Sequence, residues 1–259
     1  MKVVLLAGGF GTRISEETSA RPKPMVEIGG RPILVHIMDL FAAHGFKDFY
    51  VACGYKSDYI KRYFADFHYH NADLHISLKD GARSFENISS PDWDVHCIDT
   101  GLETMTGGRL LHMADHLSDG AFMCTYGDGL SDVALGELLA FHRAHGKLAT
   151  VTAVHPPARF GALELDGDMV TRFSEKPRTG RDWINGGFFV FEPGILDYIE
   201  ASDSSLEADV LEKVAAEGQL AAFHHDGFFQ PMDTLREKQL LEQLWKSGEA
   251  PWAARVGRT

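Results

Sequence analysis

The chain has 259 residues, of which 44% are hydrophobic and 24% are charged. This composition excludes disordered, collagen-like and coiled-coil proteins, and the length allows a large globular domain with a sizeable core. The formal net charge of -12 repels the phosphates of nucleic acids and anionic membrane surfaces, so we expect neither nucleic acid nor membrane as a partner.

Cysteine usage indicates a reducing compartment. Cys53, Cys97 and Cys124 form no Cys-x-x-Cys pair and are odd in number, which argues against a disulfide framework and against a cysteine zinc site. The apolar run near the start covers only residues 3–7, which is too short for the core of a signal peptide. We therefore expect a cytoplasmic protein in which Cys53 and Cys124 are core residues.

Short apolar runs alternate with amphipathic stretches along the first 156 residues. Gly45 and Gly146 follow two of these stretches, where the end of a helix favours a positive φ. This alternation is typical of a doubly wound sheet whose parallel strands are buried. The runs predict strands at 2–7, 46–53, 73–78, 121–126 and 148–154, and the stretches predict helices at 32–44, 108–117 and 133–145.

After residue 156 the sequence pattern predicts antiparallel elements. Asp166-Gly167 between two short runs predicts an antiparallel hairpin, and a further strand is predicted at 186–191. Helices are predicted at 207–217 and 234–245, with a strand-like stretch at 220–229 between them. We expect an α/β fold, a Rossmann-like doubly wound mixed sheet with added antiparallel hairpins, in a single domain spanning 1–259.

Residues 80–106 form a long polar segment without clear periodicity. Segments of this length inside a compact domain are usually functional lids, binding loops or oligomer arms. We expect this segment to become ordered around a nucleotide or around a neighbouring subunit.

A glycine-rich loop directly follows the first predicted strand. Its sequence, Gly8-Gly9-Phe10-Gly11-Thr12-Arg13, lacks the third glycine of the dinucleotide fingerprint and the Gly-Lys-Ser/Thr of a Walker A loop. Three glycines still let backbone N–H groups approach an anion, and Thr12 and Arg13 add donors. The loop therefore predicts phosphate binding, with a plain strand-to-helix turn as the alternative.

Two further residues suggest chemistry with phosphates. Lys23 lies between Pro22 and Pro24, which stiffen the backbone that carries its ammonium group; a solvated surface lysine is the alternative. Asp128 lies between two glycines at the end of an apolar strand, where ligands bind in open parallel sheets. Its carboxylate suits Mg²⁺ bound together with substrate phosphates, although aspartate also favours turns.

The motifs AGGFGTR and RPKPMVEIGG together resemble the signature of the sugar-1-phosphate nucleotidyltransferases. Further landmarks of that family follow in order over about 250 residues. In detail, including Met105-Thr106-Gly107-Gly108-Arg109, the chain looks most like the cytidylyltransferases among them. The later landmarks are Tyr126-Gly127-Asp128-Gly129, Phe160-Gly161-Ala162, Glu175-Lys176-Pro177, Asn185-Gly186-Gly187 and Pro231-Met232-Asp233-Thr234.

The resemblance implies a role for each matching residue. It assigns catalysis to Arg13, Lys23 and Asp128, and Mg²⁺ binding to Asp128 and Asp233. A helix N-cap at Met232 or Asp233 is a second expectation for that segment. The nucleotide-binding residues it implies are Leu6, Ala7, Gly8, Gly9, Phe10, Gly11, Thr12, Arg13, Lys23, Thr104, Thr106, Gly107, Arg109 and Asp128. The sugar-phosphate-binding residues are Tyr126, Gly161, Glu175, Lys176, Asn185 and Gly186.

The resemblance also implies the reaction. It is nucleotidyl transfer from CTP to α-D-glucose 1-phosphate, giving CDP-glucose and pyrophosphate for deoxysugar and cell-surface polysaccharide synthesis. The nucleotide part would span about 1–156 and the sugar-phosphate part about 157–259. A homo-oligomer, such as a hexamer, is expected because the resembling enzymes associate.

The choice of base leaves alternatives open. Related uridylyl- and thymidylyltransferases carry a glutamine-proline-glycine segment where this chain has Met105-Thr106-Gly107-Gly108, which favours cytosine. Thr106 and nearby backbone groups would then read the edge of the base. Use of UTP or dTTP, and a non-catalytic sugar-nucleotide sensor, remain the alternatives.

His112 and His116 stand four residues apart on a predicted helix, but Met113 replaces the glutamate of a zinc-binding His-Glu-x-x-His motif. These histidines are therefore expected to be surface or packed side chains. The aromatic run Phe188, Phe189 and Phe191 is expected in the core.

Overall fold

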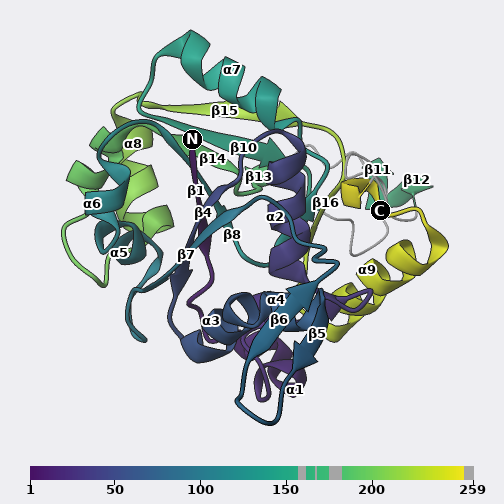
Figure 1. Cartoon of the computed structure of the whole chain (residues 1–259). Coiled ribbons are helices and arrows are strands. Elements are labelled where there is room, and N and C mark those ends of the chain that lie inside the picture. The colour runs from purple at the N-terminus through teal and green to yellow at the C-terminus, as the bar shows by residue number, and fades with distance from the viewer. Residues whose placement is uncertain (157–161, 167, 175–182, 254–259) are drawn as a thin grey trace.

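A computed structural model describes residues 1–156, 162–166, 168–174 and 183–253 of the chain. Its centre is a mixed sheet with the strand order β13-β10-β14-β8-β1-β4-β7, and β15 pairs with β10 (Figure 1). The strands of this sheet are β1 (Lys2–Leu6), β4 (Asp48–Cys53), β7 (Asp94–Asp99), β8 (Phe122–Tyr126), β10 (Ala149–Val154), β13 (Ile184–Asn185), β14 (Phe189–Phe191) and β15 (Leu220–His225).

The apolar run after Met1 forms the middle of the sheet. Strand β1 pairs in parallel with β4 on one side and β8 on the other. Its side chains alternate between two core clusters, with Val3 and Leu5 in one and Val4 in the other. A strand covered on both faces needs apolar residues at every position, which explains why the run does not alternate.

The sheet becomes antiparallel where the chain returns after residue 183. Strand β14 pairs antiparallel with β8 and with β10, whereas β15 pairs with β10 in parallel. The strand predicted at 186–191 begins only at Phe189, because Gly187 and Phe188 have φ values of 73° and 44°. Backbone in this left-handed region does not continue a strand, so these two residues separate β13 from β14. The expected mixed sheet is confirmed.

Helices cover both faces of the sheet (Figure 1). Strong predictions at 32–44 and 133–145 are confirmed, and both helices are followed by a glycine with positive φ. The helix predicted at 108–117 is divided into two short ones. The helices are α1 (Ser15–Thr18), α2 (Ile33–Ala43), α3 (Ser57–Ala65), α4 (Phe67–His70), α5 (Thr106–Leu111), α6 (Ala114–Leu117), α7 (Leu135–His145), α8 (Glu212–Ala216) and α9 (Leu235–Ser247).

Short elements complete the chain. The hairpin predicted around Asp166-Gly167 is present as an antiparallel pair. Thr234 caps α9 and forms a reciprocal capping box with Glu237, so the cap lies one residue later than Asp233. The remaining strands are β2 (Glu27–Ile28), β3 (Arg31–Pro32), β5 (Asp73–Ile76), β6 (Arg83–Glu86), β9 (Gly129–Ser131), β11 (Ala162–Asp166), β12 (Met169–Ser174) and β16 (Phe229–Pro231), with 3-10 turns at Thr12–Ile14, Lys23–Met25, Pro193–Tyr198 and Pro251–Ala253 and a π-helix at Leu206–Leu211.

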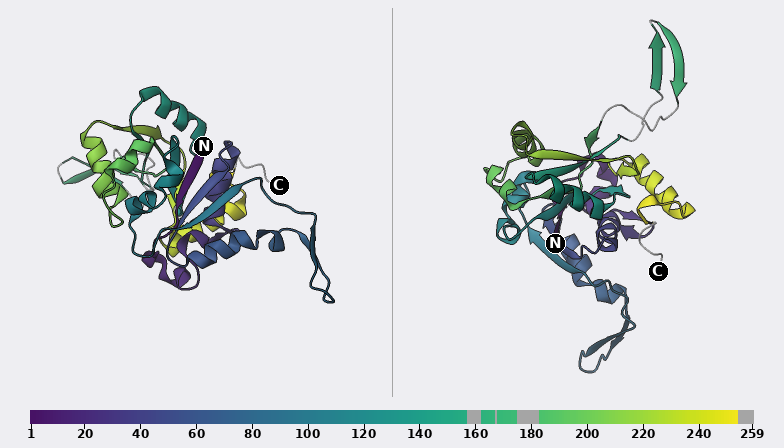
Figure 2. Two further views of the ribbon diagram at one scale, coloured as in Figure 1. Left: turned by 60° about the vertical axis from the view of Figure 1, so that its left-hand side comes forward. Right: turned by 90° about the horizontal axis from the view of Figure 1, so that it is seen from above.

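Two predictions for the middle of the chain are wrong. The strand at 73–78 is not part of the central sheet, because β5 pairs with β6 in a hairpin that extends away from the body (Figure 2). All four residues of β5 are exposed to solvent. The segment 80–106 also contains two strands that were not predicted: β6 in that hairpin, and β7, which pairs with β4 at the end of the central sheet.

The core confirms several residue assignments. Cys53, Cys124 and the three aromatic residues at 188, 189 and 191 are buried, and the three cysteines are free thiols. Within the described residues, no helix is long and apolar enough to cross a membrane.

Candidate active site

A cavity of about 330 Å³ opens where β1 and β8 end. This is the edge of the sheet at which ligands bind in open α/β folds. Of the predicted nucleotide-binding residues, only Phe10 and Gly107 do not line it. The lining residues are Leu6, Ala7, Gly8, Gly9, Gly11, Thr12, Arg13, Lys23, Pro24, Thr104, Met105, Thr106, Arg109, Tyr126 and Asp128.

The glycines of the loop are required by close contacts. At Gly11 the φ of 64° is left-handed, and a Cβ there would lie 2.8 Å from a methyl carbon of Thr18. At Gly8 a Cβ would lie 2.1 Å from the guanidinium of Arg109. The backbone can therefore pass close to Arg109 and Lys23 only with glycine at these positions.

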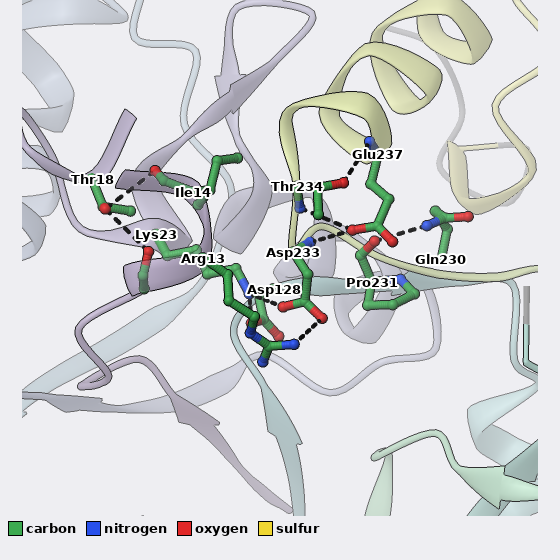
Figure 3. A network of polar contacts seen from close by, with 11 residues as sticks. Arg13, Ile14, Thr18, Lys23, Asp128, Gln230, Pro231, Asp233, Thr234 and Glu237 are labelled. Carbon is green, nitrogen blue, oxygen red and sulfur yellow. Dashed lines mark hydrogen bonds and ion pairs between the residues drawn. The ribbon is translucent and has the colours of Figure 1, made fainter. Parts of the chain in front are cut away.

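Lys23 connects the two predicted metal ligands. Its Nζ donates to Asp128 Oδ2 at 2.5 Å and to Asp233 Oδ1 at 2.6 Å (Figure 3). Arg13 Nη1 donates to the other oxygen of Asp233 at 2.8 Å. Four charged groups that are far apart in the sequence thus meet at one end of the cavity.

The lysine is buried and charged. Only 7% of Lys23 is exposed, and burial alone would lower the pKa of its ammonium group. The attraction and hydrogen bonds of Asp128 and Asp233 outweigh this effect, so the pKa of Lys23 is raised above its usual value. Lys23 therefore carries a full positive charge at neutral pH.

Local structure holds these side chains in place. Pro22 is extended, with φ -68° and ψ 151°, and leads into the 3-10 turn that carries Lys23. Asp128 lies between β8 and β9, and the N–H of Asp233 donates to Glu237 Oε2 at 2.7 Å at the start of α9. The stiff segment predicted around Lys23 is thus present, and the cap of α9 fixes the backbone of Asp233.

The donor set suits a hard divalent cation. Asp128 and Asp233 already share one cationic group, the ammonium of Lys23. Mg²⁺ in proteins commonly takes one or two carboxylates and completes its coordination with water and substrate phosphates. No cluster of three or more His, Cys, Asp or Glu side chains able to hold a metal is found among the described residues. The fit to such an ion therefore rests on the two carboxylates alone.

Arg109 is a buried organiser of the loops around the cavity. Its guanidinium donates to the carbonyl oxygens of Gly8 at 3.1 Å and Gly101 at 2.9 Å, and to Thr100 Oγ1 at 2.7 Å. Burial lowers the pKa of Arg109 below its usual range. The structure therefore places Arg109 against the backbone of the nucleotide loop, with little of its side chain exposed.

Part of the predicted sugar-phosphate pocket is described. Asn185 Nδ2 donates to the hydroxyl of Tyr126 at 3.1 Å. Gly186 packs so closely that a Cβ would lie 2.6 Å from Val154 Cγ1. The other three predicted residues, Gly161, Glu175 and Lys176, lie outside the described residues.

A model of the nucleotidyl transferase family matches residues 2–246 of the chain. The chain belongs to this family. The glucose-1-phosphate cytidylyltransferase of Salmonella typhi is 49% identical over 253 residues, which cover 97% of this chain and 98% of that protein. The predicted family is thereby confirmed, and this nucleotidyltransferase is an enzyme of the transferase class.

Solved structures confirm the fold. HddC from Yersinia pseudotuberculosis superposes with a TM-score of 0.65 at 23% identity, covering 94% of this chain and 99% of that one. A UDP-glucose pyrophosphorylase complexed with UDP-glucose gives a TM-score of 0.67 at 14% identity, covering 95% and 98%. The sheet of this nucleotidyltransferase is therefore of the expected type.

One residue of the site was missed from the sequence. Glu207 accepts hydrogen bonds from Thr106 Oγ1 at 2.7 Å and from the hydroxyl of Tyr126 at 2.6 Å. In the sequence it reads as an ordinary acidic residue in the first turn of a helix, where acids favour the helix dipole. No local pattern indicates that it reaches residues 101 and 81 positions earlier.

Proposed function

We propose that this nucleotidyltransferase converts CTP and α-D-glucose 1-phosphate into CDP-glucose and pyrophosphate. An oxygen of the sugar phosphate forms a bond to the α-phosphorus of CTP, and the bond between the α-phosphorus and the bridging oxygen to the β-phosphate breaks. The pyrophosphate leaves with the electrons of that bond. No general base is needed because the attacking oxygen is already ionised.

The cluster of Lys23, Asp128, Asp233 and Arg13 at the end of a glycine-loop cavity carries this proposal. The two reactants are anions, so catalysis depends on neutralising their charge and aligning them. The name of the relative at 49% identity supports the same substrates. A close relative alone would not distinguish an enzyme from a binder, but the cluster retains every charged residue that the chemistry needs.

Each residue has a place in the proposed mechanism. The glycine loop would hold the triphosphate, and Arg13, whose side chain is 72% exposed, would exchange its pairing with Asp233 for the outer phosphates. Lys23 would bridge phosphate oxygens near the reacting phosphorus. Asp128 and Asp233 would hold Mg²⁺, which supplies Lewis-acid stabilisation of the phosphates when bound.

The base is proposed to be read at the loop from Met105 to Arg109. Met105 and Thr106 line the cavity, and cytosine presents a donor and an acceptor where uracil presents the reverse. A site arranged for one pyrimidine leaves buried groups unpaired against the other. Transfer from UTP or dTTP is the alternative within the same chemistry.

The deciding experiment is pyrophosphate release from CTP, UTP, dTTP, ATP and GTP, each with glucose 1-phosphate and Mg²⁺. We expect kcat/KM for CTP to exceed that for UTP by at least ~10-fold, because each unpaired group in the base site disfavours the wrong base by ~1 to 3 kcal/mol. Equal rates with CTP and UTP would contradict cytidylyl specificity. Nucleotide binding without any turnover would support a sensor instead.

Further proposals concern organisation and location. The part spanning about 1–156 would bind the nucleotide and the part spanning about 157–259 the sugar phosphate, within one domain. The β5–β6 hairpin would contact a second copy in a homo-oligomer, because Leu74, Ile76 and Ile88 are exposed on or beside it. Three free thiols fit a reducing cytoplasm, and the product would serve deoxysugar and cell-surface polysaccharide synthesis.

A further inference from the structure

Glu207 contacts two residues that line the cavity, and among the described residues the side-chain donors to its carboxylate are all hydroxyl groups. Its Oε2 accepts from Thr106 Oγ1 at 2.7 Å and from Ser205 Oγ at 2.9 Å, and its Oε1 accepts from Tyr126 at 2.6 Å. Thr106 and Tyr126 both line the cavity. One carboxylate therefore connects the loop from Met105 to Arg109 with Tyr126, which accepts a hydrogen bond from Asn185.

Thr106 is fully engaged by this arrangement as a donor. Its single hydroxyl proton points to Glu207, and its oxygen accepts from the N–H of Leu206 at 2.9 Å. A hydroxyl has one proton to donate, so Thr106 has none left for a base. Its role in the structure is to fix the start of α5 against the segment that carries Glu207.

Tyr126 is oriented by the same carboxylate. Its hydroxyl donates to Glu207, so the lone pairs of the oxygen face outward, and Asn185 Nδ2 donates to one of them. Burial, followed by the negative charge of Glu207, raises the pKa of Tyr126 well above its usual range. Tyr126 is therefore a neutral donor to Glu207 and never a base near neutral pH.

The backbone around Glu207 is unusual. It lies in a π-helix, Leu206–Leu211, capped by Ser205, whose side chain accepts from the N–H of Ala208. Single π-turns are rare and occur frequently at functional sites, because the wider turn moves a side chain out of the ordinary helical register. Hydrogen bonds from Tyr126 and Thr106 outweigh burial and lower the pKa of Glu207, which keeps it ionised.

We propose that Glu207 is a positioning residue. Through Thr106 and Tyr126 it sets the distance between the loop from Met105 to Arg109, on the nucleotide side of the cavity, and the sugar-phosphate side. The proposal rests on the proposed function, because the two sides are assigned to the two substrates. Glu207 holds both sides in register, so that binding at one side prepares the other.

The test is Glu207→Gln, which keeps the shape of the side chain but has only one oxygen to accept from the three hydroxyl donors Thr106, Ser205 and Tyr126. We expect KM for the nucleotide and KM for the sugar phosphate each to rise about 10-fold, since hydrogen bonds to a charged group are the strong ones. Glu212→Gln, an equal loss of charge at an exposed position in the following helix, is the matched control and should leave both KM values unchanged.

A double-mutant cycle separates positioning from simple loss of stability. Tyr126→Phe removes one of the hydrogen bonds that Glu207→Gln weakens, so the double variant should show KM values no more than about twofold above the worse single variant. Multiplicative effects would overturn the proposal. So would a Glu207→Gln enzyme whose KM values stay within twofold of the parent.

The substrate of the assay is the nucleoside triphosphate that the parent enzyme uses best. If CTP is not that nucleotide, the proposed base specificity fails while the test of Glu207 proceeds with the nucleotide found. A rise in KM for one substrate alone would also overturn the inference, because a residue that serves only one side does not connect the two.

Discussion

The carboxylates that line the cavity or contact its lining residues are partnered in two different ways. At one end Asp128 and Asp233 are paired with the cations Lys23 and Arg13, whereas at the other Glu207 is paired with neutral hydroxyls of Thr106 and Tyr126. Charged partners can be exchanged for ligands of the same charge. A metal ion can replace the cations beside the carboxylates, and phosphates can replace the carboxylates beside Lys23 and Arg13. Hydroxyl partners offer a fixed geometry instead. Under the proposed mechanism, the first set would exchange partners during turnover and the second would keep its shape.

The largest effect is expected at Lys23, the cation that Asp128 and Asp233 share. Lys23→Ala should lower kcat/KM by at least ~10²-fold, because loss of one preorganised donor to developing charge typically costs ~3 kcal/mol. It also leaves two carboxylates facing each other without their shared cation. Steady-state pyrophosphate release measures the change.

The matched control is Lys47→Ala, which removes an exposed lysine paired with Asp92 at 2.7 Å away from the cavity. It should leave kcat/KM within twofold of the parent, as expected for an exposed ion pair. A Lys23→Ala enzyme that retains a third of the parent activity would remove Lys23 from the reaction centre.

A smaller effect is expected from the two carboxylates proposed to hold Mg²⁺. Asp128→Asn and Asp233→Asn should each raise the Mg²⁺ concentration for half-maximal rate by about 10-fold, because one of two charged oxygen ligands is lost. Chelation with EDTA should abolish turnover of the parent. Asp119→Asn, which removes an exposed carboxylate near Lys2, is the control, and a titration matching this control in either variant would exclude that residue from the metal site.

Substitution of Thr106, which donates to Glu207, should have a weaker effect that differs between nucleotides. Thr106→Val removes the donor to Glu207 and should reduce the preference for CTP over UTP by about 5-fold, because the base loop shifts while Arg13 and Lys23 still hold the phosphates. Thr106→Ser keeps the hydroxyl and should retain the preference. Competition assays with both nucleotides measure the ratio; an equal loss for CTP and UTP would show that the loop does not read the base.

The smallest effect is expected at His36, a buried histidine that does not line the cavity. Its substitution should change the pH dependence of stability. Its Nε2 contacts the carbonyl of Ile28 at 2.8 Å, and its Nδ1 accepts from the indole N–H of Trp252. Burial lowers the pKa of His36 to about 4. A proton on Nδ1 would set one donor against another, so the folded protein favours the neutral ring.

The sign of the pH effect follows from this lowered pKa. The unfolded chain takes up the proton near pH 6.5, before the folded protein does, so stability is complete above that pH and falls toward pH 4. His36→Gln, which does not titrate, should lose about 2 kcal/mol less stability than the parent between about pH 8 and about pH 5. Urea unfolding at the two pH values measures this difference; parallel losses would mean that His36 is protonated equally in both states.

Local signals in the sequence predicted much of the fold. The run from Lys2 to Leu6, the glycines that end α2 and α7, and the glycine loop all depend on residues close together in the chain. Strand β7 was missed because an edge strand pairs on one side only and carries polar residues on its exposed face. The run at 73–78 was placed in the core because apolar composition does not reveal whether a strand finds a partner in the sheet.

Site residues that belong to recognisable sequence motifs could be predicted from the sequence. Lys23, Asp128 and Asp233 were assigned by their motifs and do meet in the structure. Glu207 could not be found in this way, since its partners are set by the packing of the π-helix against α5 rather than by neighbours in the sequence. The hydroxyl of Thr106, expected to face a base, points to Glu207 for the same reason.

The wide separation of the reacting charges has a consequence for synthesis of the chain on the ribosome. Lys23 and Asp128 are 105 positions apart, and Lys23 and Asp233 are 210 apart. At roughly 5–20 residues per second, the growing chain exposes Lys23 and Asp128 about 5–20 s before Asp233 is made. The nascent protein can therefore contain β1, β4, β7 and β8 before Asp233 is made. Under the proposed mechanism, activity then begins only when the segment leading into α9 docks, so this docking is the step of folding that completes the enzyme.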